Sequence, residues 1–77
     1  MKGYSGALED FTQAIILDPN HAGGYYWRGY IKYFLKDKQG MKEDIEIAVA
    51  LDPSDKTGQA IVKNITKKLN EEVEEGL

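Results

Sequence analysis

The sequence predicts an all-α fold, a solenoid of antiparallel helix-turn-helix units with four helices in total. Apolar residues recur at spacings of three and four along most of the 77-residue chain, which is the period of amphipathic helices. The tripeptide Leu-Asp-Pro occurs at 17–19 and again at 51–53, a distance of 34 residues. The segments that lead into these tripeptides, 6–19 and 40–53, are identical at seven of fourteen positions, so the chain contains an internal repeat.

The first helix is predicted over residues 4–18. Its apolar face has the spacing of a helix and consists of Ala7, Phe11, Ala14 and Ile15. Asp18 precedes Pro19, and the residue before a proline disfavours helical geometry. The helix should therefore end at this point.

The second helix, predicted over about 23–36, holds six of the eight aromatic residues of the chain. At helical spacing its apolar residues form two adjacent stripes, which are Tyr26, Tyr30, Tyr33 and Phe34, and Trp27, Ile31 and Leu35. A surface helix needs only one such stripe. Two interpretations follow: either the rings are core residues covered on more than one side, or some of them line a binding groove.

The third helix is predicted over 38–51, with Asp37 as its N-cap. Its apolar face consists of Met41, Ile45, Ala48 and Val49. A last helix over 56–75 has one narrow apolar stripe, and most of its other positions are charged. The stripe residues are Val62, Ile65, Leu69 and Val73. This pattern is typical of a polar-faced capping helix at the end of a solenoid.

The repeat resembles the tetratricopeptide repeat, whose unit is a 34-residue pair of antiparallel helices. Residues 22–55 are similar to one complete unit, with Tyr25, Gly29, Ala48 and Pro53 at signature positions. The segment 4–18 then corresponds to the second helix of a preceding unit, and 56–75 to a capping helix. The resemblance implies a single domain over 1–77. Lys63 departs from the pattern, because it stands where a further unit would have its helix-contact glycine.

Composition argues against catalysis. The chain has no cysteine and one histidine, so the sequence offers no disulfide and no evident site for a metal or a cofactor. The acidic residues that the repeat duplicates are expected at solvent-facing helix positions rather than as a general acid and base: Glu9, Asp10, Glu43 and Asp44. We therefore do not expect an enzyme.

Charge and hydropathy leave a protein partner as the expectation. The net charge of −3 does not favour nucleic acid. RNA binding by base stacking is an alternative, but it has only Arg28, Lys32 and Lys36 along the aromatic helix to hold phosphates. No apolar run approaches the length of a membrane span, and no signal peptide is evident, so a cytoplasmic location without membrane contact is expected.

The resemblance also implies where a partner would bind. Tetratricopeptide domains hold peptides or other proteins on the concave surface formed by the first helices of successive units. The corresponding candidates in the aromatic helix are Tyr26, Trp27, Tyr30, Tyr33 and Phe34. Those in the last helix are Ala60, Ile61, Lys68 and above all Asn64 and Lys67. Tyr26 and Tyr30 occupy the places of the lysine and asparagine that clamp chaperone tails in one subset of the family, which argues against that ligand.

Self-association is a further expectation. Ala7, Phe11 and Ala14 would pack on a first helix that the chain lacks ahead of them. Burying a phenylalanine side chain contributes ~1.5–3 kcal/mol, so this face should be covered, and a homodimer formed by contact or by helix exchange would cover it. The alternatives are an oligomerisation unit or isolated repeat fragment without a separate ligand, and a start inside a longer chain with some exposure tolerated.

Overall fold

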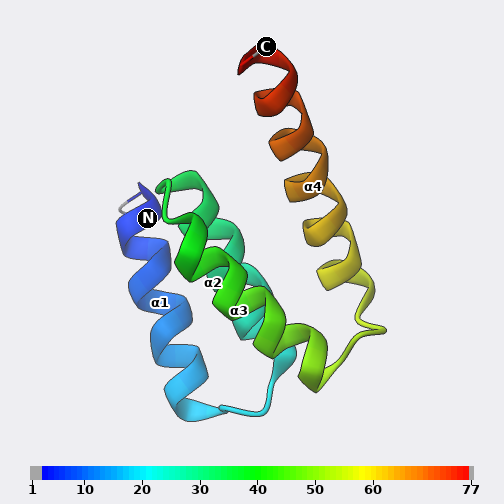
Figure 1. The fold of residues 1–77 in the computed structure, drawn as a ribbon. Helices are drawn as coiled ribbons and strands as arrows, with labels where there is room; N and C mark the ends of the chain where they lie inside the picture. Colours follow the sequence, from blue (N-terminus) through cyan, green and yellow to red (C-terminus); the bar gives the residue numbers. More distant parts are fainter. Residues whose placement is uncertain (1–2, 77) are drawn as a thin grey trace.

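The computed structural model describes the backbone of residues 3–76 and the side chains of residues 3–72. This part of the chain forms four helices: α1 (Gly3–Leu17), α2 (Ala22–Phe34), α3 (Lys38–Leu51) and α4 (Lys56–Gly76). Figure 1 shows α1, α2 and α3 side by side and α4 leaving the bundle toward its C-terminus. The central helix is α2, because it contacts each of the other three. The predicted all-α, four-helix fold is confirmed.

The helix ends follow from local sequence signals. α1 and α3 end at Leu17 and Leu51, each two residues before a proline, as predicted. The Asp37 carboxylate caps α3 by accepting the backbone N–H of Gly40 at 2.9 Å, which confirms the predicted N-cap. α4 begins in the same way, since Asp55 Oδ1 accepts the N–H of Gly58 at 2.8 Å.

Between α2 and α3 the chain turns through Lys36, which has φ 67°. Its N–H donates to Tyr33 O at 3.0 Å, and the N–H of Asp37 donates to Lys32 O at 2.9 Å. These two bonds make a Schellman motif, which satisfies the last carbonyls of α2. The tight turn brings α3 directly back along α2.

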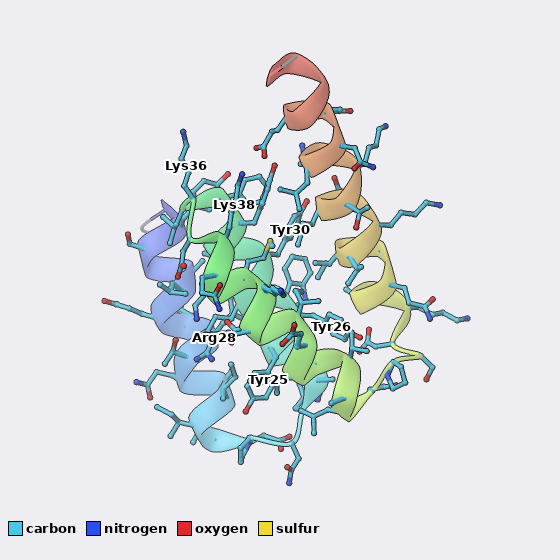
Figure 2. All side chains as sticks on the ribbon, in the orientation of Figure 1. Tyr25, Tyr26, Arg28, Tyr30, Lys36 and Lys38 are labelled. Carbon is cyan, nitrogen blue, oxygen red and sulfur yellow. The ribbon has the colours of Figure 1, made fainter. Side chains whose placement is uncertain are left out.

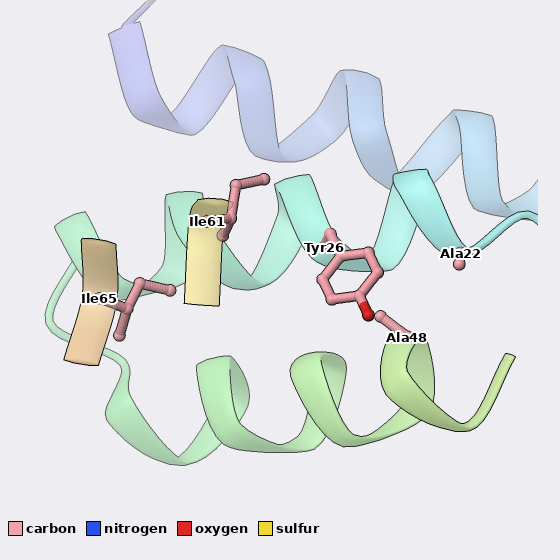
Figure 3. Packing of buried hydrophobic residues seen from close by; sticks show 5 residues of the cluster. All are labelled: Ala22, Tyr26, Ala48, Ile61 and Ile65. Atoms are coloured by element: carbon pink, nitrogen blue, oxygen red, sulfur yellow. The ribbon is translucent and has the colours of Figure 1, made fainter. Parts of the chain in front are cut away.

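The core lies where α2, α3 and α4 meet. It is built from Ala22 and Tyr26 of α2, Ala48 of α3, and Ile61 and Ile65 of α4 (Figure 3). Tyr26 is 1% exposed, and its hydroxyl donates to the backbone carbonyl of Asp52 at 2.9 Å. α4 approaches this ring through Gly58, where a Cβ would lie 2.3 Å from Tyr26 Cε2. Only a residue without a side chain fits at position 58 in this packing.

The predicted apolar faces of α3 and α4 are found with one exception. Ala48 is fully buried, and Met41, Ile45, Val62 and Leu69 pack around the core. The prediction for Val49 is wrong: it is 42% exposed, since it lies about 100° around the helix from the fully buried Ala48. Val73 lies outside the described side chains.

Candidate partner-binding surface

A continuous series of aromatic rings runs along the contact between α1 and α2. This aromatic row consists of Tyr4 and Phe11 of α1 and Trp27, Tyr30 and Phe34 of α2. Tyr4 stacks on Phe34 with ring centroids 5.0 Å apart, and Phe11 stacks on Trp27 at 6.0 Å. Within α2, Tyr30 contacts Trp27 at 6.0 Å and Phe34 at 4.9 Å. Such pairs contribute roughly 0.5–1.5 kcal/mol each beyond area burial, so the row also holds α1 on α2.

The aromatic row connects two hollows of the surface. The Trp27 hollow, of about 330 Å³, is lined by Phe11, Ala14, His21, Gly23, Gly24, Tyr26, Trp27, Asp55, Thr57 and Gly58. The Phe34 hollow, of about 340 Å³, is lined by Tyr33, Phe34, Lys36, Lys68, Glu71 and Glu72. Both are lined partly by α2 and partly by α4 or its N-cap, and each contains at least one ring of the aromatic row.

The Phe34 hollow contains a polar clasp between α4 and the α2–α3 turn. Glu72 accepts a hydrogen bond from the Tyr33 hydroxyl at 3.2 Å and one from Lys38 Nζ at 3.2 Å. The Lys38 bond, followed by that of Tyr33, lowers the pKa of Glu72. Partial loss of solvent, followed by the bond to Glu72, raises the pKa of the Tyr33 hydroxyl. The Lys38 and Glu72 side chains are 62% and 47% exposed, so the clasp is weak.

The structure divides the predicted partner-binding residues. Trp27 is 38% exposed, while Tyr30, Tyr33 and Phe34 are half-buried and line the surface just described. The prediction for Tyr26 is wrong, because its ring packs in the core between α2, α3 and α4 and is only 1% exposed. The sequence pattern could not reveal this, since Tyr26 and Trp27 are neighbours on two stripes of equal apolar character.

The α4 candidates are also divided. Lys67 lies in a different hollow, formed by α4 residues alone, together with Lys63, Thr66, Asn70 and Glu71. Asn64 is exposed and lines neither the Trp27 nor the Phe34 hollow. Lys68 is the α4 lysine that the fold brings next to the aromatic row, because it lies one residue further round the helix.

The residues predicted for self-association differ in their surroundings. Ala7 is 2% exposed within the single chain, so the expectation that it lacks a packing partner is wrong. α2 runs along α1 and covers this residue without a second copy. Phe11 is half-buried against Trp27, and Ala14 is exposed in the wall of the Trp27 hollow. Of these three residues, Phe11 and Ala14 retain exposed surface that another molecule can cover.

One polar cluster departs from the sequence prediction. Asp44 was expected to face solvent but is 2% exposed. Its two carboxylate oxygens accept hydrogen bonds from Arg28 Nε and Nη2, each at 2.8 Å, and Lys32 Nζ lies 3.0 Å from Oδ2. Bidentate pairing with Arg28 makes the burial possible, since a buried carboxylate needs charged partners. The hydrogen bond to Asp44 is the main reason that the pKa of Arg28 is raised.

A signal for this cluster existed in the sequence. Arg28 and Lys32 are four residues apart, so they lie on one face of α2, opposite an acidic residue of the antiparallel α3. Glu9, Asp10 and Glu43 are exposed, as predicted. The cluster also weakens the RNA alternative, because two of its three cations are engaged by Asp44 and are not available to phosphates.

Comparison with known proteins gives a partial match. The chain is 38% identical over 74 residues to RNA polymerase II-associated protein 3 of Xenopus tropicalis. The match covers 96% of the chain but only 11% of that protein, so the chain spans a small part of its relative. No protein-family model matches the chain. No solved structure matches it either.

Membrane-spanning and metal-binding features are both absent from the described residues. None of their helices combines the length and the apolar character that crossing a bilayer requires. No group of three or more histidine, aspartate or glutamate side chains among them is arranged to hold a metal ion.

Proposed function

We propose that the chain is a tetratricopeptide-type interaction module that binds a protein or peptide segment over the aromatic row. The observation that carries the proposal is Trp27, a large apolar side chain that is 38% exposed between two hollows instead of buried. Tryptophan and tyrosine are enriched among the residues that dominate protein interfaces. The 34-residue repeat and the four-helix fold support the assignment to this repeat type.

A protein partner fits the surroundings of the aromatic row better than nucleic acid does. The row consists of aromatic rings, and the two cationic residues of α2, Arg28 and Lys32, are paired with Asp44. The name of the Xenopus relative describes association with RNA polymerase II, which is compatible with a partner-binding role for the chain. We propose no catalytic role and no cofactor. A cytoplasmic location stays part of the proposal, with the nucleus as the alternative that the relative's name raises.

Self-association over the same surface is the second candidate. Ala14 and the exposed parts of Phe11 and Trp27 lie together in the Trp27 hollow, where a second copy would cover apolar area. In that case the chain is an oligomerisation unit, and the aromatic row has no separate ligand. Light scattering after size exclusion distinguishes the two, because a monomer at high micromolar concentration contradicts the oligomerisation unit.

Selection from a random peptide library tests the interaction module. Peptides displayed on phage are selected on the wild-type chain and then measured against Trp27→Ala and a matched control, Ile47→Ala. Ile47 is an exposed apolar residue of α3, 42% exposed, and it lies outside both hollows. We expect Trp27→Ala to weaken binding at least tenfold, a loss of about 1.4 kcal/mol, and Ile47→Ala to leave it unchanged. Selected peptides that bind both variants equally well would contradict the proposal.

A further inference from the structure

We infer that the Trp27 hollow is a subsite for a basic side chain of the bound segment, with arginine as the best fit. An acidic residue of the same segment then lies at the Phe34 hollow. The inference rests on the proposed function, because it specifies the chemistry of the partner at that same surface. It follows from the charges and side-chain shapes at the two ends of the aromatic row.

The walls of the Trp27 hollow suit an arginine. The rings of Phe11 and Trp27 are nearly parallel, with an interplanar angle of 6°, and they supply flat apolar surface for the stem and the guanidinium plane. Gly23 and Gly24 also line the hollow, and the space beside their Cα atoms is occupied by the side chains of His21 and Ile15. Arginine combines these features, since it stacks on aromatic faces and pairs with carboxylates.

Asp55 supplies the carboxylate. Its Oδ1 accepts the N–H of Gly58 at 2.8 Å, and no described residue donates a hydrogen bond to Oδ2. No lysine, arginine or histidine nitrogen of the described residues lies within 4.0 Å of this carboxylate. Burial is the main cause that raises the pKa of the Tyr26 hydroxyl, and the nearby charges of Asp55 and Asp52 add to it. A basic ligand group would pair with Oδ2, while Oδ1 stays with the N-terminus of α4 that Asp55 caps.

The Phe34 hollow has the opposite character. Lys36 and Lys68 line it, and neither has a carboxylate of the described residues within 4.0 Å. Glu71 and Glu72 face three lysines here, Lys36, Lys38 and Lys68, so these five residues carry a net charge of +1 (three positive, two negative). Figure 2 shows Lys36 and Lys38 toward the same end of α2, with Tyr26 further back along the helix. An acidic ligand group is favoured at this end.

The length of α2 sets the spacing of the two ligand charges. Gly24 in the first hollow and Phe34 in the second are ten residues apart on α2, which corresponds to about 15 Å at 1.5 Å per residue. An extended peptide covers that distance in about five residues at ~3.3 Å each. The segment should therefore carry its basic and acidic residues about five positions apart.

A defined probe tests the subsite. The dipolar peptide is acetyl-Arg-Ala-Leu-Ala-Ala-Glu-amide, and the neutral peptide has glutamine at both ends. Both are titrated at pH 7.5 while the amide and indole NMR signals of Trp27 are followed. Each charge pair is partly solvated, so we expect the neutral peptide to bind about 3- to 10-fold more weakly.

Asp55→Asn isolates the arginine contact. Asparagine retains the capping function at the start of α4, so the helix should be kept. We expect this variant to lose affinity for the dipolar peptide but not for the neutral one. Asp10→Asn, which removes an exposed carboxylate of α1, is the matched control and should change neither.

Three results overturn the inference. One is equal affinity for the two peptides, and another is an Asp55→Asn variant that binds both as the wild type does. The third is no shift of Trp27 signals at millimolar peptide, where even a contact worth about 4 kcal/mol would be visible. The proposed function fails separately, only when phage selection also gives no peptide that depends on Trp27.

Discussion

Replacing Tyr26 by phenylalanine tests the assignment of this residue to the core. The substitution keeps the ring and removes only the hydroxyl that donates to Asp52 O at 2.9 Å. A buried hydrogen bond contributes about 0.5–1.5 kcal/mol net, and the carbonyl left behind adds to the loss. We therefore expect the free energy of unfolding to fall by about 1–1.5 kcal/mol. For a domain of this size each kcal/mol lowers the melting temperature by roughly 4–8 °C, so a fall of roughly 4–12 °C is expected.

Thermal unfolding followed by circular dichroism at 222 nm measures this change. Tyr30→Phe is the matched control, because the Tyr30 hydroxyl has no hydrogen-bond partner among the described residues and the ring stays in the aromatic row. The control should change stability by less than about 0.5 kcal/mol, as surface substitutions usually do. If Tyr26→Phe melts together with Tyr30→Phe, the hydroxyl does not fix the end of α3, and the account of the α2–α3–α4 core is wrong.

Three further predictions concern the helix contacts. Gly58→Ala places a Cβ 2.3 Å from the Tyr26 ring, so it should lower the free energy of unfolding by about 1–3 kcal/mol in a urea titration. This loss is expected even though alanine is the better helix former. Unchanged stability would contradict the close approach of α4. Asp44→Ala leaves Arg28 and Lys32 without their carboxylate and should lower the free energy of unfolding by about 2–4 kcal/mol. The loss is smaller than for a fully buried pair, because each cation side chain is about one-fifth exposed. A urea midpoint equal to that of the wild type would refute this prediction. The pKa of Glu72 is lowered in the folded chain, so its stabilising contribution is complete above the ordinary carboxyl pKa of about 4.3 and is lost as pH falls through the lower, folded value. Glu72→Gln should abolish the acid-dependent shift of the Tyr33 ring signals in NMR, and persistence of that shift would exclude the clasp.

Local signals in the sequence predicted the four helices and the ends of α1 and α3, but the predicted end of α2 at Lys36 is wrong, because α2 ends at Phe34 and Lys36 has φ 67° in the turn. The two Leu-Asp-Pro tripeptides stop α1 and α3, and Asp37 caps α3 through its own carboxylate. These features depend on residues within one helical turn of each other. The antiparallel arrangement was implied by the resemblance of the 34-residue repeat to the tetratricopeptide unit.

The assignment of rings to core or surface could not be made from periodicity. Tyr26 and Trp27 are about 100° apart around α2, and both stripes are apolar. The packing of α4 decides which ring is buried, because Ile61 and Ile65 of α4 pack around Tyr26. These residues are more than 30 positions away from Tyr26 in the sequence, so local periodicity does not reveal the contact. Gly58 was the available signal: a residue without a side chain in α4 faces the ring that is buried.

Asp44 illustrates the same limit for a charged residue. Its repeat partner Asp10 is exposed, so equivalence within the repeat predicts exposure for both. The two positions differ because Asp44 faces Arg28 and Lys32 of α2, and Asp10 has no described residue of opposite charge within 4.0 Å. The difference lies in the helix that each acid meets, which the internal repeat does not encode.

The central claim is that the aromatic row is the surface that meets a partner. The most direct measurement maps amide chemical-shift changes over the whole chain when a library-selected peptide is added. We expect the changes to concentrate on residues 27–34 and Phe11, with α3 unaffected on its outer face. Changes centred on Ile47 and Leu51 of α3, with Trp27 unmoved, would contradict the account.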